Sequence, residues 1–279
     1  MNIVFCGDAN IRDGVLTSVL SLLRFQDLPL NVTIATASIH VDGQTFGAVD
    51  EAFAAQLDAL LRTERPGSSA RLIDLTKPFA EQPPTANLHT RFTPCCTLRL
   101  YLDLVPELAG RVLYLDNDVL CHGPIAELET LDMRGAEIAG VLDRYGRWLF
   151  HHEPRCWDYL NSGVLLMDMD RIRATGLFKR CRALCAQKQM FMPDQSALNK
   201  LSQRKLQLPR RFNEQLRLQP NTVFQHFSTR FGPFGLVNVK PWQIERMHGE
   251  LKTHAYDDVL KRYQRLRSQF INSTERNPK

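Results

Sequence analysis

The chain has 279 residues, 44% of them hydrophobic, and a formal net charge of +5. This length suits one large domain or a domain with an appendage, and the charge is too small to indicate nucleic-acid binding by itself. Its seven cysteines include no Cys-x-x-Cys pair matched to a second His or Cys pair, so neither a disulfide framework nor a structural zinc site is supported, and reduced thiols are expected.

Short apolar runs alternate with longer helical patterns along most of the chain. The pattern predicts strands at residues 3–5, 32–36, 72–75, 112–115, 138–142 and 163–167. It predicts helices around residues 15–23, 48–61 and 98–104, with breaks at Pro78, Pro83 and Pro84. Such alternation is typical of an α/β domain with a mostly parallel sheet and helices on both faces. We place a nucleotide-binding-like domain at residues 1–245 and a separate segment at residues 246–279.

From His254 onward the sequence predicts an amphipathic helix. Its apolar and basic residues alternate at helical spacing: Tyr256, Leu260, Tyr263, Leu266 and Phe270, interleaved with Lys261, Arg262, Arg265 and Arg267. Either the helix packs on the domain with a solvated cationic face, or it lies on an anionic membrane surface. The start of the chain lacks signal-peptide features and no run reaches the roughly 20 apolar residues of a membrane span. We therefore expect a cytoplasmic protein, with peripheral attachment to the inner face of the membrane as the second interpretation.

The most informative pattern is an apolar run that ends in Asp116-Asn117-Asp118. At an extended strand end, residues i and i+2 project to the same side, so Asp116 and Asp118 would present oxygen donors to a common point. A cation or a hydrogen-bond network would have to offset their repulsion and lost hydration. Open α/β sheets also bind ligands at the carboxyl ends of their strands. Two solvated aspartates in a turn are the alternative, because Asp is common in turns.

A second Asp-x-Asp, Asp168-Met169-Asp170, also follows an apolar strand. Arg171 and Arg173 follow at once and Asp170 precedes a predicted helix, so an N-cap or ion-pair role is sufficient. The spacing alone therefore does not identify a metal site.

Several motifs occur together in one order, at residues 4–10, 113–118, 160–166 and 193–196, followed by His226 and by Lys240-Pro241-Trp242. In this order they resemble glycosyltransferase family 8, retaining enzymes that include bacterial lipopolysaccharide galactosyl- and glucosyltransferases. The resemblance spans roughly residues 1–242. It implies the GT-A fold, a Rossmann-like, mostly parallel sheet with helices on both faces, here with a small helical appendage at the carboxyl end.

The resemblance implies a binding site for a UDP-sugar. Asp8 and Asn10 fall where the family holds uracil and ribose, and a carboxylate there can accept hydrogen bonds from both. Arg99 matches an arginine that reaches the diphosphate and the donor sugar. Lys240 matches a lysine on the diphosphate, where it adds positive charge as negative charge accumulates. Without the family, Asp8 would be interpreted as a helix N-cap or Asx-turn residue.

The resemblance also implies a metal site. Asp116 and Asp118 match the family's metal ligands, His226 completes the set, and Asn117 belongs to the donor-binding residues. Mixed carboxylate and imidazole ligation suits Mn²⁺ better than Mg²⁺, which is the second choice. The ion would act as a Lewis acid on the leaving UDP. The segment 227–239 is longer than the corresponding loop of bacterial relatives.

Asp143, Asn161, Asp194 and Gln195 match residues around the donor sugar, and we expect Gln195, Asp194 and Arg99 to take part in catalysis. Gln195 resembles the residue nearest the β face of the sugar. Its uncharged amide is a poor nucleophile, so a front-side, ion-pair-like substitution is favoured, with a covalent intermediate as the alternative. Asp194 could also cap the helix that begins there.

The predicted activity is metal-dependent, retaining transfer of galactose or glucose from UDP-galactose or UDP-glucose to a glycan or glycolipid acceptor. One alternative is a non-catalytic module that binds sugar nucleotides or glycans. Another is a nucleotidyltransferase, although the chain lacks the phosphate loop Gly-x-x-x-x-Gly-Lys-Ser/Thr. Nucleic acid is the least favoured partner, because the basic residues are expected to cluster in the terminal helix.

Overall fold

The structure, a computed structural model, describes residues 1–144, 158–232 and 235–271. Its centre is a seven-stranded sheet in the order β10-β8-β9-β6-β1-β2-β5. The paired strands run parallel except for β9, which is antiparallel to both of its neighbours. The strands are β1 (Asn2–Gly7), β2 (Asn31–Thr36), β5 (Ser69–Asp74), β6 (Arg111–Leu115), β8 (Ile138–Leu142), β9 (Leu160–Asp168) and β10 (Lys205–Gln207).

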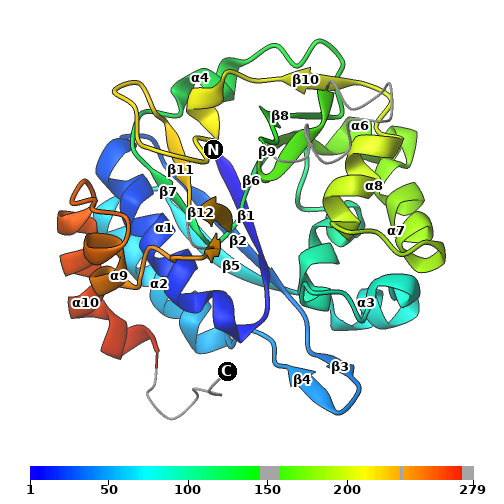
Figure 1. The fold of residues 1–279 in the computed structure, drawn as a ribbon, viewed down its shortest axis with the longest axis horizontal. Coiled ribbons are helices and arrows are strands. Elements are labelled where there is room, and N and C mark those ends of the chain that lie inside the picture. The colour runs from blue at the N-terminus through cyan, green and yellow to red at the C-terminus, as the bar shows by residue number, and fades with distance from the viewer. Residues whose placement is uncertain (145–157, 233–234, 272–279) are drawn as a thin grey trace.

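Helices cover both faces of this sheet (Figure 1). Alternate side chains of a strand point to opposite faces, so Ile3 and Phe5 of β1 join one buried core and Val4 joins the other. The first face is covered by α1 (Arg12–Phe25), α2 (Glu51–Glu64) and α10 (Asp257–Phe270), with α4 (Ala126–Thr130) and α9 (Ile244–Gly249) nearby. The second face is covered by α3 (Thr76–Glu81), the 3-10 helix η3 (Pro94–Leu104), α6 (Met169–Thr175), α7 (Leu177–Gln187) and α8 (Pro193–Leu201). The expected α/β architecture is confirmed.

Short strand pairs complete the fold. β7 (Val119–Cys121) pairs antiparallel with β11 (Phe224–His226), and this register sets His226 opposite Val119. The other pairs are β3 (Ile39–Val41) with β4 (Gln44–Phe46), and β12 (Arg230–Gly232) with β13 (Gly235–Val237). The pairing of β7 with β11 matters most for the site, because it brings His226 from late in the chain next to the Asp116–Asp118 region.

Two local predictions were wrong in detail. Pro78 does not break regular structure but lies in the first turn of α3, where a missing N–H is tolerated. Asp168, and not Asp170, caps α6, since its side chain accepts the backbone N–H of Arg171 at 2.9 Å. The second Asp-x-Asp pair thus has both roles expected of it, since Asp168 caps the helix and Asp170 forms the alternative ion pair, with Arg173 at 3.7 Å.

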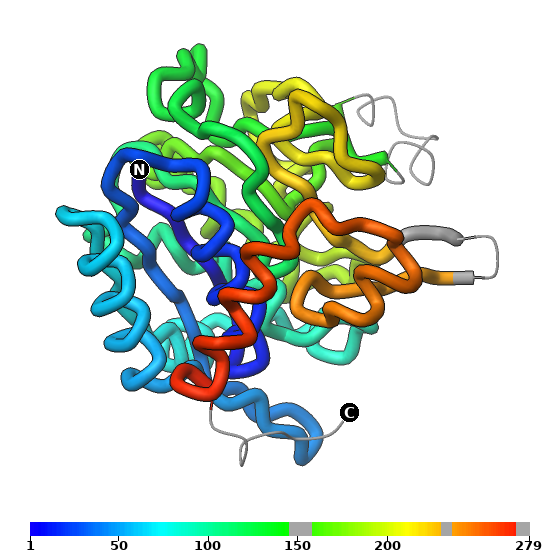
Figure 2. Tube along the Cα trace, turned by 90° about the vertical axis from the view of Figure 1, so that its left-hand side faces the viewer, coloured from blue at the N-terminus to red at the C-terminus, as the bar shows by residue number. Residues whose placement is uncertain are grey.

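The terminal helix α10 packs along α1 (Figure 2). Val259, Tyr263 and Phe270 are buried in the core on that face of the sheet, and Arg267 pairs with Asp13 of α1 at 2.9 Å. The aromatic face that could have lain on a membrane is therefore occupied by the domain itself. No helix in the described part of the chain is both long and apolar enough to cross a bilayer.

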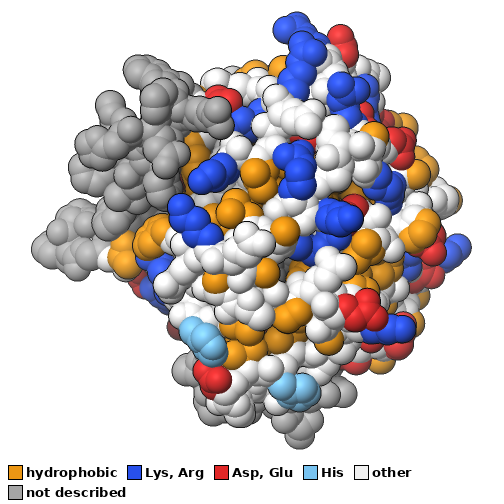
Figure 3. Space-filling model, turned by 90° about the vertical axis from the view of Figure 1, so that its right-hand side faces the viewer, with side chains coloured by type: hydrophobic (Ala, Val, Ile, Leu, Met, Phe, Trp, Pro, Cys, Tyr) orange, Lys and Arg blue, Asp and Glu red, His pale blue; other side chains and the backbone are white. Residues whose placement is uncertain are grey.

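The sequence predicted that the basic side chains would cluster in the terminal helix. In the structure, basic side chains also gather on another surface. Figure 3 shows Lys and Arg side chains gathered on the face that carries α6, α7 and α8. Lys179, Lys188 and Lys200 are exposed there. The positive charge is thus spread over at least two surfaces, which corrects the expected clustering. The proposed domain boundary at residue 245 stays a prediction.

Candidate active site

The site forms where several strand ends meet at one edge of the sheet. The carboxyl ends of β1, β6 and β8 meet there, and β9 begins there because it runs antiparallel to its neighbours. A cavity of about 540 Å³ opens at this edge. The predicted site residues that line it are Asp8, Arg99, Asp116, Asn117, Asp118, Asp143, Asn161, Asp194, Gln195, His226 and Lys240. Asn10 is the exception, since it lies exposed and donates from its side chain to Asp8 at 3.1 Å.

Asp116 and Asp118 lie in a tight turn and do not continue the extended strand. The N–H of Val119 donates to the carbonyl of Asp116 at 3.1 Å and closes the turn. Both carboxylates still face one point, because Nε2 of His226 lies 3.2 Å from Oδ1 of Asp118 and 3.7 Å from Oδ2 of Asp116. The alternative of a turn is thus right for the backbone, but Asp118 is buried and the Asp116 side chain is only 26% exposed, so the pair is not fully solvated.

The spacing of these three side chains fits a metal ion. One candidate ligand atom from each of Asp116, Asp118 and His226 lies within 4.8 Å of the others. Buried carboxylates need a compensating positive charge, and imidazole with carboxylate is an ordinary donor set for Mn²⁺. The set is therefore chemically suited to a divalent cation.

Asn213 orients the histidine. Nδ1 of His226 lies 3.2 Å from Oδ1 of Asn213, whose Nδ2 donates to Oδ1 of Asn161 at 2.8 Å. The Asn213 oxygen thus accepts the Nδ1 proton and leaves Nε2 directed at the carboxylates, which is the arrangement of a supported metal ligand. Burial opposes protonation of His226, but the charges of Asp118 and Asp116 outweigh it and raise its pKa. A proton and a metal ion would therefore compete for Nε2.

Gly163 makes room for this arrangement. A Cβ at this position would collide with Cε1 of His226 and lie 2.9 Å from Oδ2 of Asp116. Its carbonyl also accepts the N–H of Asp116 at 2.8 Å. The strand β9 can therefore approach the two ligands only because the residue carries no side chain.

Two cations of the chain neutralise the carboxylates. Nζ of Lys240 contacts Oδ2 of Asp118 at 2.5 Å. Although burial acts to raise it, Lys240 and His226 hold the pKa of Asp118 well below its usual range. Arg99 donates to Asp116 at 2.9 Å and pairs with Asp194 at 3.0 Å. Arg99 thus links the metal-binding side of the cavity to the predicted sugar-binding side.

Gln195 lies at the centre of the predicted sugar-binding group. Its Oε1 accepts the N–H of Ser162 at 2.9 Å, and its Nε2 donates to Asp143 at 3.1 Å. Asn161 donates to the same Asp143 oxygen at 2.8 Å. These bonds hold Asp143, Asn161 and Gln195 as one buried polar network. Such a network positions its members with little freedom.

The two capping alternatives have opposite outcomes. Asp8 caps the short 3-10 helix η1 (Ala9–Ile11), accepting the N–H of Asn10 at 3.0 Å, so the capping role is confirmed. Asp194 does not cap α8, because Met192 holds that position and makes no side-chain bond. Asp194 instead faces Arg99, and burial raises its pKa while Arg99 partly opposes the rise.

Sequence reasoning missed several residues that support the site. Tyr114 donates from its hydroxyl to Asp116 at 2.7 Å, and its ring lies 4.0 Å under the Arg99 guanidinium. Tyr114, Ser162 and Gly163 lie inside the motifs at residues 113–118 and 160–166. Their position next to predicted site residues could therefore have indicated a role in supporting the site. Asn213 had no such signal, because it lies in an irregular connection before β11.

The sequence model of glycosyl transferase family 8 matches residues 2–243. The chain belongs to glycosyltransferase family 8. Among curated family-8 relatives, the glycosyltransferase GlyF of Streptococcus pneumoniae serotype 4 (strain ATCC BAA-334 / TIGR4) is 28% identical over 62% of this chain and 42% of its own length. Glucoside xylosyltransferase 1 of Rattus norvegicus is 29% identical over 61% of this chain and 38% of its own length. The match thus spans less than half of each relative.

Solved structures show the same fold. An active-site mutant of LgtC superposes with a TM-score of 0.67 and 20% identity over 96% of both chains. The galactosyltransferase LgtC in complex with donor and acceptor sugar analogues has a TM-score of 0.66 and 21% identity over 99% of this chain and 98% of that one. The expected family and the GT-A fold are confirmed.

Proposed function

We propose that this chain is a metal-dependent, retaining hexosyltransferase that moves galactose or glucose from a UDP-sugar to a glycan or lipid-linked glycan. The convergence of Asp116, Asp118 and His226 beside Lys240 in the cavity carries the proposal. LgtC, a galactosyltransferase, shares the fold, whereas the curated relatives include xylosyltransferases. The relatives therefore do not agree on one donor sugar, and the choice of hexose is part of the proposal.

Asp116, Asp118 and His226 would hold Mn²⁺, with Mg²⁺ as the alternative. A bound ion would supply Lewis-acid stabilisation of the charge that develops on the leaving diphosphate. Lys240 contacts Asp118 and lines the same cavity, so its ammonium group would lie near the same diphosphate oxygens. Asp8 and Asn117 line the cavity too, where we place the nucleoside, while Asn10 would act only by holding Asp8.

Asp143, Asn161, Asp194 and Gln195 would bind the hydroxyl groups of the donor sugar. The amide oxygen of Gln195 already accepts two hydrogen bonds from Ser162 and carries no charge, which supports a positioning role. In the proposed front-side substitution, the acceptor oxygen bonds to the anomeric carbon on the face from which the diphosphate oxygen leaves. The acceptor proton passes to that diphosphate oxygen, and the configuration is retained. A covalent intermediate on a carboxylate is the alternative.

The acceptor would enter over an aromatic rim of the cavity. Phe191 and Leu236 line the cavity and are 49% and 59% exposed. The Arg91 guanidinium lies 4.5 Å from the ring centre of Phe191 and 4.7 Å from that of Phe92. The exposed ring of Phe191 and the guanidinium stacked on it suit the apolar faces and hydroxyl groups of a sugar, so we place the acceptor at this rim.

A cytoplasmic location with contact to the inner face of a membrane also belongs to the proposal. The aromatic face of α10 packs on α1, so only the other side of this helix could contact a membrane. Arg262 pairs with Glu64, and Arg267 with Asp13. The exposed basic residues of α10 are Lys261 and Arg265.

The decisive test measures release of UDP from a panel of UDP-sugars with Mn²⁺, with and without acceptor glycans. We expect Asp118→Asn to lower turnover about 10³-fold, since a metal on the leaving group supplies several kcal/mol. Asp170→Asn is the matched control, because Asp170 belongs to the second Asp-x-Asp and is exposed. Undiminished turnover in Asp118→Asn would contradict the metal assignment. Binding of UDP without turnover would indicate the non-catalytic module, and release of the sugar 1-phosphate in place of UDP would indicate a nucleotidyltransferase.

A further inference from the structure

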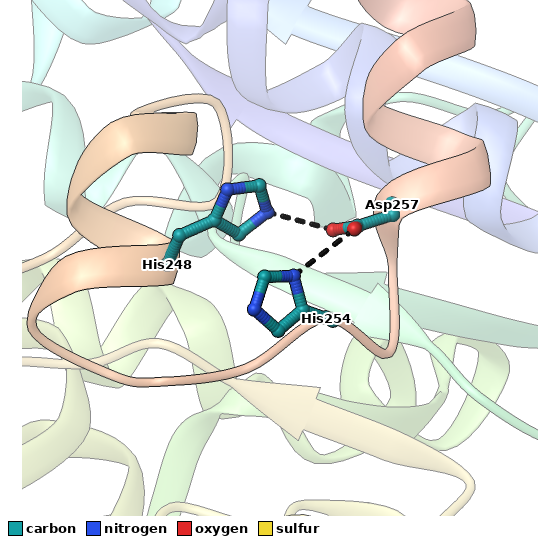
Figure 4. Close-up of side chains that lie close together, drawn as sticks. All are labelled: His248, His254 and Asp257. Atoms are coloured by element: carbon teal, nitrogen blue, oxygen red, sulfur yellow. Dashed lines mark hydrogen bonds and ion pairs between the residues drawn. The ribbon is translucent and has the colours of Figure 1, made fainter.

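A second group of potential metal ligands lies outside the cavity, where α9 meets α10 (Figure 4). Nε2 of His248 lies 2.7 Å from Oδ1 of Asp257, and Nδ1 of His254 lies 3.1 Å from Oδ2 of the same carboxylate. The two imidazole rings stack with centroids 4.3 Å apart. One candidate ligand atom from each residue lies within 4.8 Å of the others. All three side chains thus point toward one another.

We propose that His248, His254 and Asp257 form a second metal site, which binds Zn²⁺ or a cation of similar softness. This site is separate from the one proposed at Asp116, Asp118 and His226. Two imidazoles with one carboxylate favour such ions over Mg²⁺ or Ca²⁺, which prefer oxygen. In a tetrahedral zinc site the ligand atoms lie about 3.3 Å apart, because each is about 2.0–2.2 Å from the ion. The two imidazole nitrogens lie 2.7 and 3.1 Å from the two oxygens of Asp257, and the three ligand atoms lie within 4.8 Å of one another, so rotation of these side chains would bring them to this spacing.

The hydrogen bonds of the cluster already direct both rings at one carboxylate. A carboxylate accepts hydrogen bonds, so each imidazole presents an N–H to Asp257 without metal, and a bound cation would take the place of these protons. Both imidazoles reach solvent, and the His254 side chain is 67% exposed. Water can therefore carry these protons and fill the fourth coordination position.

The position of this site implies that a bound cation would stabilise the packing around it. A buried apolar cluster lies beside it and consists of Leu120, Phe227, Val239, Met247, Tyr256 and Leu260. Met247 and Tyr256 directly precede two of the proposed ligands, and the same cluster contains the chain neighbours of His226 and Lys240. A cation that joins α9 to α10 would fix the layer on which these two catalytic-site residues rest. We therefore expect binding at this site to stabilise the fold.

The experiment uses the full chain without a histidine tag, stripped of metal and carrying Asp118→Asn to disable the catalytic site. Calorimetric titration with Zn²⁺ and the visible spectrum with Co²⁺ measure binding, and thermal unfolding measures its effect. We expect one bound ion per chain and a rise in Tm with Zn²⁺ concentration. Adding His254→Ala should weaken binding at least tenfold and abolish the rise. Because His254 is largely exposed, this change leaves the fold intact.

The matched control is His89→Ala in the same background. His89 also contacts a carboxylate, that of Asp42 at 2.8 Å, and its side chain is 61% exposed. It belongs to neither candidate metal cluster among the described residues. Zn²⁺ binding that is unchanged by His254→Ala and by Asp257→Asn, or absent from the Asp118→Asn chain, would overturn the proposal. Loss of binding in His254→Ala but not in His89→Ala supports it, whatever the outcome for the catalytic site.

Discussion

Asn213 holds the imidazole of His226 by a 3.2 Å contact between Oδ1 and Nδ1, and it is itself held by Asn161. Partners of this kind typically change metal affinity 10–100-fold when they are removed. We expect Asn213→Ala to weaken Mn²⁺ binding by about that factor, measured by calorimetry or by the EPR signal of free Mn²⁺. Asn31→Ala, at the amino end of β2, is the control and should bind normally. Equal affinities in the two variants would show that Asn213 does not orient the ligand.

Gly163 offers a test that adds atoms instead of removing them. A methyl group there would collide with His226 and approach Asp116, so Gly163→Ala should displace a ligand and strongly reduce both metal binding and donor turnover. Gly47→Ala is the matched control, since a Cβ at Gly47 meets no atom within 4 Å. Circular dichroism would verify that both variants fold. Normal metal affinity in Gly163→Ala would mean that β9 can move away at low cost.

Metal affinity should depend on pH through His226. The ordinary pKa of histidine is about 6.5, and the carboxylates raise that of His226 in the metal-free protein. Protons therefore compete with the metal to a higher pH than at an ordinary histidine, and affinity should rise with pH until that raised pKa is passed. Calorimetry at a series of pH values measures this. An affinity that is flat between pH 6 and 8 would contradict it.

The same shift has an opposite effect on the stability of the metal-free protein. Because the folded pKa of His226 is raised, its protonation stabilises the folded state fully below the unfolded value of about 6.5. This contribution is lost as pH rises through the folded pKa. Titration of the His226 resonance by NMR should show a lower pKa in Asp118→Asn, where one of the two attracting charges is gone.

The sequence predicted more of the site's composition than of its geometry. The family resemblance was what grouped Asp116, Asp118 and His226, since the ends of parallel strands could place only the two aspartates at this edge of the sheet and His226 lies on the separate strand β11. The turn at Asp116–Asp118 was predicted only as the alternative, and the position of His226 beside it was not predictable from residue patterns, since it depends on the pairing of β7 with β11, a contact between residues far apart in sequence. Asn213 could not be found for the same reason.

The terminal helix shows a different limit of prediction from sequence. Its apolar stripe fits a membrane surface and a protein core equally well, because hydrophobic periodicity records that a face is buried but not what buries it. Only the packing of Tyr263 and Phe270 against the domain distinguishes the two. The sequence therefore predicted the helix and its buried face, and the tertiary contacts decided its partner.

The aromatic rim should affect acceptor binding but not donor binding. Phe191 is exposed at the cavity, so Phe191→Ala removes surface on which a sugar ring can stack. We expect the KM for the acceptor to rise about tenfold, while UDP release without acceptor stays unchanged. Leu28→Ala is the control, because Leu28 is 51% exposed and does not line the cavity. An equal loss of acceptor-free UDP release would place Phe191 in the donor site instead.

Contact with a membrane is testable by reversing the exposed charges of α10. A Lys or Arg near an anionic surface contributes about 1 kcal/mol, so Lys261→Glu with Arg265→Glu should weaken binding to anionic vesicles about 30-fold or more. The control reverses Lys77 and Lys200, which are exposed on other helices and give the same change in net charge. Sedimentation with vesicles that contain phosphatidylglycerol measures both pairs at low salt. Equal losses of vesicle binding in the two double variants would mean that binding depends only on net charge. If the unmodified chain does not bind vesicles, the proposed membrane contact is wrong. A selective loss in the first pair would show that α10 contacts lipid through its basic side while its aromatic side stays packed on α1.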